Sequence, residues 1–424
     1  MSKARLRLVC LLLALCALVC LPPKGAGEGA NEARVRVFDD VWGLVRERYY
    51  DPALRGVDWP GLGARLRPLA AVARDEAEFY GVLRRLLASL RDPHTRVFPP
   101  GESEDWRVQR FVSVGLTVRE VEGTVVVAGV ARGSEAARAG VRLGDEIVSV
   151  DGERPEALVA RRLGDAVVSP SARPLAVARL FDGPRDTPAH LLFRREVGGR
   201  VREARLPREV FARVPEFTLK GAGGGVYVAG FNIFTEAVAA RFVRALRDEG
   251  DDARALVIDL RENGGGETEA LTDIASVLLP AGAPLGRFTG RDGRAVSEPR
   301  TRARLLSAAE APTAFTGPVV LLTGPRTASA AEVFAASLRE AGRARLFGET
   351  TCGCVLGIRR RHTLPDGGVL DISEMDYRTA GGARLEGAGL TPDEHLAPTR
   401  DELRRGRDAA LERAVAWLKA RVKT

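Results

Sequence analysis

The sequence has few histidines and cysteines, the residues that most often bind zinc. Its 424 residues include four histidines and five cysteines, and three of these cysteines lie within the first 20 residues. A tetrahedral zinc site needs four ligands, and few histidines are present to complete one around the two remaining cysteines, Cys352 and Cys354. We therefore expect neither a metal site nor any other cofactor.

Lysine is also scarce, since almost all of the 64 basic residues are arginines. The lysines are Lys3, Lys24, Lys220, Lys419 and Lys423. No lysine lies between Ser329 and residue 398. The predicted core therefore contains no lysine downstream of Ser329 that could serve as a base.

A strong excess of charge is absent as well. The net charge of +8 falls to about +4 without the first 24 residues, which contain four basic residues and no acidic one. The arginines are interspersed with acidic residues along the chain. This mild charge does not predict binding to nucleic acid or to an anionic membrane.

The N-terminus has the pattern of a secretory signal. Lys3, Arg5 and Arg7 precede an apolar run over residues 8–21, which is short for a membrane-spanning helix. We predict a signal peptide over 1–27 and export to the periplasm or the extracellular space. Attachment to a membrane is expected only through an uncleaved signal.

The mature chain is predicted to be a mixed α/β protein of several domains. Apolar residues recur at helical spacing over 31–105, which predicts an N-terminal helical domain interrupted at Pro52 and Pro60. Residues 111–205 contain β-branched runs typical of strands, with a looser stretch from about 160. Residues 212–398 alternate between apolar strands and helices, which predicts βαβ units. Residues 399–424 are predicted to form a C-terminal helix.

The segment 133–152 resembles a PDZ domain. It combines a short helix with an Ala-Gly exit and a Gly-Asp-x-Ile strand. Such domains bind C-terminal peptides by adding a strand to a sheet edge. By resemblance, the loop that holds the terminal carboxylate is Val114, Gly115 and Leu116. The alternative is a small β-domain without a peptide ligand.

Two predicted turns bring polar groups to the ends of buried strands. Ser329 follows the strand at 318–323 and lies at a helix N-terminus, where it is either a nucleophile or a helix cap. The glycine-rich turn at 263–266 follows another strand and is either a ligand-approach loop or a tight turn. For acyl transfer, the expected oxyanion donors are the amides of Ala330 and Gly265.

Several motifs in order resemble those of the C-terminal processing peptidases, or tail-specific proteases (peptidase family S41). They lie at 90–95, 259–266, 327–332, 348–353 and 385–393. The resemblance implies a crotonase-like core and a secreted serine endopeptidase that cleaves proteins or peptides with free C-terminal tails. In the common branch of this family a lysine stands at the position of Cys354.

The replacement of that lysine leaves the activating base open. Tricorn-like relatives use a histidine and a glutamate at positions that match His94 and Glu386, which implies Ser329 as nucleophile, His94 as base and Glu386 as its orienting group. A structural His94, or His362 or His395 as the base, remain alternatives. Cys354 as the nucleophile is a further one.

The cysteine pair is predicted to be two small buried side chains near the active site. In a strand, Cys352 and Cys354 would point to the same side, and a disulfide between them would be strained. The alternative to a peptidase is an inactive binding or scaffold protein on the same fold. The sequence does not predict the oligomeric state.

Overall fold

The computed structural model describes residues 26–102, 107–163, 169–184, 187–249, 252–303 and 315–422. Most of the predicted signal peptide lies outside the described residues. Within the described part of the chain, no helix is long and apolar enough to cross a membrane.

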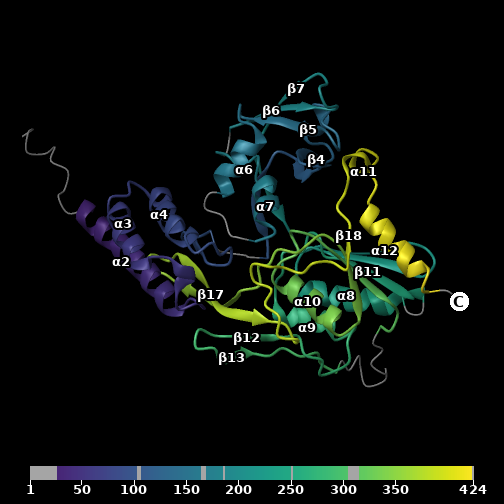
Figure 1. The fold of residues 1–424 in the computed structure, drawn as a ribbon. Helices are drawn as coiled ribbons and strands as arrows, with labels where there is room; N and C mark the ends of the chain where they lie inside the picture. The colour runs from purple at the N-terminus through teal and green to yellow at the C-terminus, as the bar shows by residue number, and fades with distance from the viewer. Residues whose placement is uncertain are drawn as a thin grey trace, which may run out of the picture.

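The N-terminal segment is helical, as its apolar periodicity predicts (Figure 1). It contains α2 (Ala26–Arg48), the short 3-10 helix η1 (Leu54–Gly56), α3 (Trp59–Ala71) and α4 (Glu76–Ala88). Their apolar faces form one core around Trp59, Tyr49 and Leu83. Pro60 does not interrupt a helix but lies in the first turn of α3, where a missing N–H costs nothing.

A β-domain (residues 116–206) lies above the rest of the molecule in Figure 1. Its antiparallel sheet has the order β3 (Leu116–Val121), β4 (Thr124–Val130), β5 (Glu146–Val150), β6 (Ala189–Arg194) and β7 (Arg202–Leu206). The helices are α5 (Glu135–Arg138), α6 (Pro155–Leu163) and α7 (Ala172–Ala178). The stretch from about 160 to 205, predicted as looser and as the end of this domain plus an insertion, contains α7, β6 and β7, which complete the domain.

The β-domain is joined to the core by a two-stranded ribbon of β2 (Gln109–Ser113) and β8 (Glu209–Arg213). Within its own sheet, β3 is an edge strand that pairs only with β4 among the described strands. One long side of β3 therefore has backbone groups without a strand partner, and α7 packs beside this strand.

The core is built on a six-stranded sheet, which confirms the predicted α/β class. Its order is β18 (Glu394–His395), β15 (Ala344–Gly348), β14 (Val319–Thr323), β11 (Ala255–Asp259), β10 (Val226–Phe231) and β9 (Phe217–Gly221). All neighbouring strands are parallel except β9 and β10. Helices cover both faces, so the central strands are apolar on both sides.

The helices on one face are α8 (Glu236–Glu249), α9 (Thr268–Ala275) and α10 (Ala330–Glu340), and α12 (Ala409–Lys419) covers the other. The prediction of one C-terminal helix was wrong, because α11 (Arg400–Arg404) and α12 are separate. Gly406 adopts φ 65° between them, a conformation that glycine accepts readily, and Asp408 caps α12 through the amide of Leu411.

A second sheet ties the helical segment to the core. Its long strand β17 (Val369–Arg378) pairs with β1 (Arg96–Phe98), β12 (Arg287–Thr289) and β16 (Gly357–Thr363), and β13 (Ala295–Ser297) pairs with β12. Figure 1 shows β17 running from the N-terminal helices towards α9 and α10. Because β1 follows His94 by two residues, this pairing brings that histidine to the core.

Candidate active site

Ser329 occupies the sharp turn between β14 and α10. Its backbone has φ 55° and ψ −123°, a left-handed conformation that is unfavourable for a residue with a Cβ atom. The amide of Ser329 donates to the carbonyl of Cys354 over 2.9 Å. A serine held on a strained strand-to-helix turn is typical of a nucleophile presented beyond the end of a sheet.

The glycine-rich turn lies directly against this serine. A Cβ atom on Gly265 would lie 2.7 Å from the Cβ of Ser329 and 3.0 Å from the amide nitrogen of Ala330. Gly265 also has φ 101°, which a residue with a side chain rarely adopts. Only glycine fits here, so this turn is the close backbone neighbour of the nucleophile.

The two predicted oxyanion donors differ in their hydrogen bonding. Ala330 is the first residue of α10, so its amide has no acceptor within the helix. The amide of Gly265 instead donates to the side-chain oxygen of Asn263 over 2.9 Å. The Ala330 amide thus has no acceptor within its own helix, whereas the Gly265 amide already donates to Asn263.

Glu332 anchors the nucleophile turn, and the sequence reasoning missed it. Its carboxylate is fully buried and accepts hydrogen bonds from the amides of Ser329 (3.2 Å), Gly353 (2.7 Å) and Cys354 (2.9 Å) and from the Thr351 hydroxyl (2.5 Å). Burial raises the pKa of Glu332 to about 7, against the effect of these donors. The available signal was its position in the first turn of the helix, three residues after Ser329.

The cysteine loop (residues 351–355) is fixed by Glu332 on one side and by a disulfide within it. Cys352 and Cys354 are bonded to each other, with Cα atoms 5.2 Å apart, and both are buried. The loop is a turn with Gly353 at φ 70°, and not a strand. The two cysteines are buried, as predicted, but the expectation of two unbonded side chains was wrong, because the argument against a disulfide assumed strand geometry.

Glu386 lies on the opposite side of this loop. Its Oε2 accepts the amide of Val355 over 3.0 Å, whereas its buried Oε1 has no hydrogen-bond partner among the described residues. The guanidinium of Arg55 lies 3.7 Å from Oε1, beyond hydrogen-bond length. Burial raises the pKa of Glu386 to about 7; the Val355 amide and Arg55 lower it, and Asp92 raises it further.

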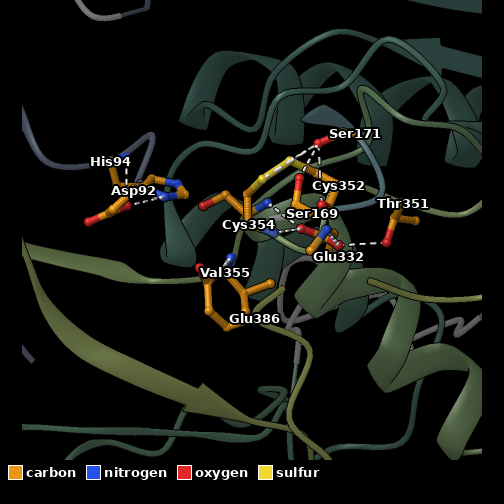
Figure 2. The surroundings of a disulfide bond; sticks show 12 residues. Asp92, His94, Ser169, Ser171, Glu332, Thr351, Cys352, Cys354, Val355 and Glu386 are labelled. Atoms are coloured by element: carbon orange, nitrogen blue, oxygen red, sulfur yellow. Dashed lines mark hydrogen bonds and ion pairs between the residues drawn. A yellow bond between two sulfur atoms is a disulfide. The ribbon is translucent and has the colours of Figure 1, made fainter. Parts of the chain in front are cut away.

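His94 faces the same region from the N-terminal segment. Figure 2 shows its imidazole directed towards the disulfide, with Asp92 beside it. Nδ1 is buried without a hydrogen-bond partner in the described structure and lies 3.8 Å from the carboxylate of Asp92. Burial lowers the pKa of His94, although Asp92 opposes this effect. His94 is therefore neutral near pH 7 and able to accept a proton.

Asp92 organises this histidine and was also missed. One of its oxygens accepts the amide of His94 over 2.9 Å, and the other accepts the hydroxyl of Thr95 over 2.6 Å. Thr95 in turn accepts the amide of Ser373 on β17. The segment that carries His94 is thus hydrogen-bonded to the second sheet.

The other histidines proposed as bases lie in different surroundings. His362 is buried on β16, with Nε2 3.4 Å from the carboxylate of Glu374. His395 is exposed on β18, at the edge of the core sheet. Neither contacts the cysteine loop through any hydrogen bond assigned in the described residues. Those residues also contain no cluster of three or more side chains suited to a metal ion.

The predicted peptide loop lies at the start of β3. Val114 and Leu116 are buried, and Gly115 between them adopts φ 76°. A cavity of about 540 Å³ extends from the free side of β3 and from α7 to the core, where Arg261 and Glu349 are among its lining residues. The cavity therefore connects the edge of the β-domain with the ends of the core strands.

A serine on a strained turn at a helix N-terminus, beside a glycine-rich turn, is the arrangement typical of serine hydrolases. The chain belongs to peptidase family S41, whose model matches residues 224–396, and residues 31–88 match the tricorn protease C1 domain. S41 peptidases are serine proteases.

One relative is the chloroplastic C-terminal processing peptidase of Tetradesmus obliquus. It is 30% identical over 370 residues, which cover 85% of this chain and 77% of the relative. Among solved structures, the photosystem II D1 C-terminal processing protease has a TM-score of 0.53 at 26% identity and covers 89% of this chain and 98% of its own. Mature CPAF has a TM-score of 0.70 at 14% identity, covering 93% and 99%, which is a likeness of fold.

Proposed function

We propose that the protein is an exported serine endopeptidase in which Ser329 is the nucleophile and His94 its base. The observation that carries this proposal is the strained backbone of Ser329, since a left-handed serine costs about 1–3 kcal/mol and persists where function requires it. Nδ1 of His94 and Oε1 of Glu386 support it, because neither has a hydrogen-bond partner among the described residues, and such buried polar atoms are typical of groups that await a ligand or a proton.

The steps follow from these groups. Neutral His94 takes the proton of the Ser329 hydroxyl as its oxygen attacks the carbonyl carbon of the substrate. The amide of Ala330 and the N-terminus of α10 stabilise the oxyanion that forms. Gly265 contributes a second donor when its N–H leaves Asn263. His94 then protonates the departing amine, and water hydrolyses the acyl-enzyme with His94 again as base.

Glu386 is the orienting carboxylate in this proposal, and Cys354 takes no direct part. Glu386 is held by the Val355 amide and lies within electrostatic reach of Asp92, whose carboxylate is the one beside the imidazole of His94, 3.8 Å from Nδ1. Cys354 stands where the common branch has its lysine, but its sulfur is bonded to Cys352. A disulfide sulfur has no thiolate, so it neither attacks a substrate nor accepts the serine proton.

The β-domain is proposed to act as a PDZ domain that binds substrate tails. A tail would add a strand to the free side of β3, with its carboxylate at the loop of Val114, Gly115 and Leu116. The cavity lined by β3, α7 and the ends of the core strands supports a peptide site between the β-domain and the core, although neither Ser329 nor residues 114–116 line it. A disulfide next to the nucleophile supports export, since disulfides persist in oxidising compartments.

The test is cleavage of a protein substrate with a free C-terminus, followed by mass spectrometry. The matched control is the same substrate with an amidated C-terminus, and Ser329→Ala controls for contaminating peptidases. We expect the wild type to cleave the free-tailed substrate faster and Ser329→Ala to cleave neither. Equal rates on both substrates would contradict the proposed recognition of the free tail. No cleavage of either substrate would favour a binding protein on this fold.

A further inference from the structure

The disulfide beside the nucleophile is held by a residue of the β-domain. Ser171 is fully buried, and its hydroxyl oxygen lies 3.0 Å from the sulfur of Cys352, 3.3 Å from the carbonyl oxygen of Cys352 and 3.9 Å from the sulfur of Cys354. Figure 2 shows Ser171, with Ser169 next to it, against the disulfide on the side away from Glu386. The proposed reaction does not use this contact.

The cysteine loop transmits its position directly to the nucleophile. The carbonyl of Cys354 accepts the Ser329 amide, and the amides of Gly353 and Cys354 donate to Glu332, which also accepts from Ser329. The next amide, that of Val355, fixes Glu386. A displacement of the loop therefore moves both the nucleophile turn and the proposed orienting carboxylate.

Ser171 is also connected, through α7, to β3, the proposed tail-binding strand. Ser171 immediately precedes α7, and α7 packs beside β3. A continuous series of contacts thus runs from β3 through α7 and Ser171 to the disulfide and Ser329. Every step in it is between residues that are in contact in the structure.

We propose that the Cys352–Cys354 disulfide and Ser171 form a positioning unit that sets Ser329 for acylation, and that reduction by a dithiol inactivates it. The proposal rests on the serine peptidase function proposed above. In the reductive step a dithiol transfers two electrons and two protons to the disulfide, so that the S–S bond is replaced by two thiols and the reductant becomes a disulfide. The freed side chains no longer constrain the loop.

The loss of that constraint is expected to slow acylation strongly. Catalytic groups tolerate little displacement, and a shift of about 1 Å costs as much as about 100-fold in rate. The reduced loop keeps its bonds to Glu332, so a smaller effect of about tenfold is expected. Export to an oxidising compartment would keep the unit in its active form.

The experiment uses the purified full chain before and after treatment with dithiothreitol, with maleimide labelling and peptide mapping to verify reduction at Cys352 and Cys354. The rate of reaction with a fluorophosphonate probe reports on Ser329. Hydrogen exchange of the peptides that contain Ser329 and the cysteine loop reports on positioning, independently of activity. We expect reduction to slow labelling about tenfold, to raise exchange in both peptides, and to be reversed by reoxidation.

Variants test the contributions of the disulfide and of Ser171 separately. The double variant Cys352→Ser/Cys354→Ser is expected to label slowly and to be unaffected by dithiothreitol. Ser171→Ala is expected to label about threefold more slowly, with a lower kcat and an unchanged KM on a short ester. Ser149→Ala is the matched control, because Ser149 is a buried serine of the same domain whose hydroxyl has no hydrogen-bond partner among the described residues. It should leave the rate and the exchange unchanged.

The outcomes distinguish this proposal from the peptidase itself. Unchanged labelling and exchange after verified reduction would overturn the positioning unit and leave the peptidase standing. A probe adduct that moves to Cys354 on reduction would overturn it as well. If no condition gives labelling but reduction still raises exchange around Ser329, then the peptidase function fails and the structural coupling stands.

Discussion

The two sides of the candidate active site differ in how completely their polar groups are paired. On the core side, the Glu332 carboxylate accepts four hydrogen bonds that fix the Ser329 turn and the cysteine loop. Nδ1 of His94 on the N-terminal side, and Oε1 of Glu386 from a neighbouring loop of the core, are buried and have no hydrogen-bond partner among the described residues. The core side therefore fixes the nucleophile by hydrogen bonds, whereas His94 and Glu386 each keep a buried atom that is able to accept a proton.

The largest expected effect is on the N-terminal side. His94→Ala should slow fluorophosphonate labelling of Ser329 by roughly 1000-fold, because it removes the proposed general base. His395→Ala is the matched control, since His395 is exposed at the edge of the core sheet, and it should label at the wild-type rate. Equal rates for the two variants would end the role proposed for His94.

The next effect is expected on the core side and concerns stability. Glu332→Ala leaves the donors of Thr351, Gly353 and Cys354 unpaired in a buried site, which costs more than about 3 kcal/mol. Urea unfolding measures this loss. Glu386→Ala releases one amide donor and should cost clearly less; a larger loss for Glu386 would reverse the comparison between the two sides.

The dependence of stability on pH follows from the same two carboxylates. Burial raises the pKa of each from its ordinary value of 4.5 to about 7. The unfolded chain therefore releases these protons at lower pH than the folded protein, so stability is fully present below 4.5 and falls as pH rises to about 7. The expected loss is up to about 3 kcal/mol per group.

Thermal unfolding between pH 4.5 and 8 tests this expectation. The Glu386→Gln variant, which carries no titrating group at that position, should lose less stability over the interval than the wild type. Parallel curves for the two proteins would show that Glu386 is already ionised at low pH, and with it that its surroundings are more polar than the structure indicates.

The smallest expected effect comes from Arg55, which lowers the pKa of Glu386 from a distance of 3.7 Å. Arg55→Ala should move the acid limb of the labelling rate upwards by roughly half a pH unit, because the carboxylate then ionises later. Arg67→Ala is the control, as Arg67 forms an exposed pair with Asp39. An identical pH profile for both variants would place Arg55 outside the site.

Much of this fold could be predicted from sequence because its pattern is local. The apolar strands at 255–260 and 318–323 and the helix that begins at 268 between them follow from periodicity, and the glycine-rich turn follows from its composition. The break at Gly406 was missed because a single glycine in an amphipathic pattern is also compatible with an unbroken helix. Local sequence patterns therefore predict the presence of a helix or strand better than the residues at which it begins and ends.

The site was harder to predict where it depends on tertiary contacts. The disulfide requires a turn at Gly353, and this turn is set by Glu332 from another element. The contact of Ser171 with Cys352 spans 181 residues, and the hydrogen bond of Gly265 to Asn263 depends on a side-chain orientation. Sequence periodicity contains no information on such tertiary contacts. Ser329, in contrast, was proposed from a local motif at 327–332 that resembles the family.

The most direct test of the account is site-mapped labelling of the mature protein with a fluorophosphonate, using intact mass and peptide mapping. The account predicts one adduct, on Ser329, which is absent from Ser329→Ala. An unlabelled wild type with its disulfide intact, or an adduct on any other residue, would contradict the claim that the strained turn presents an activated serine.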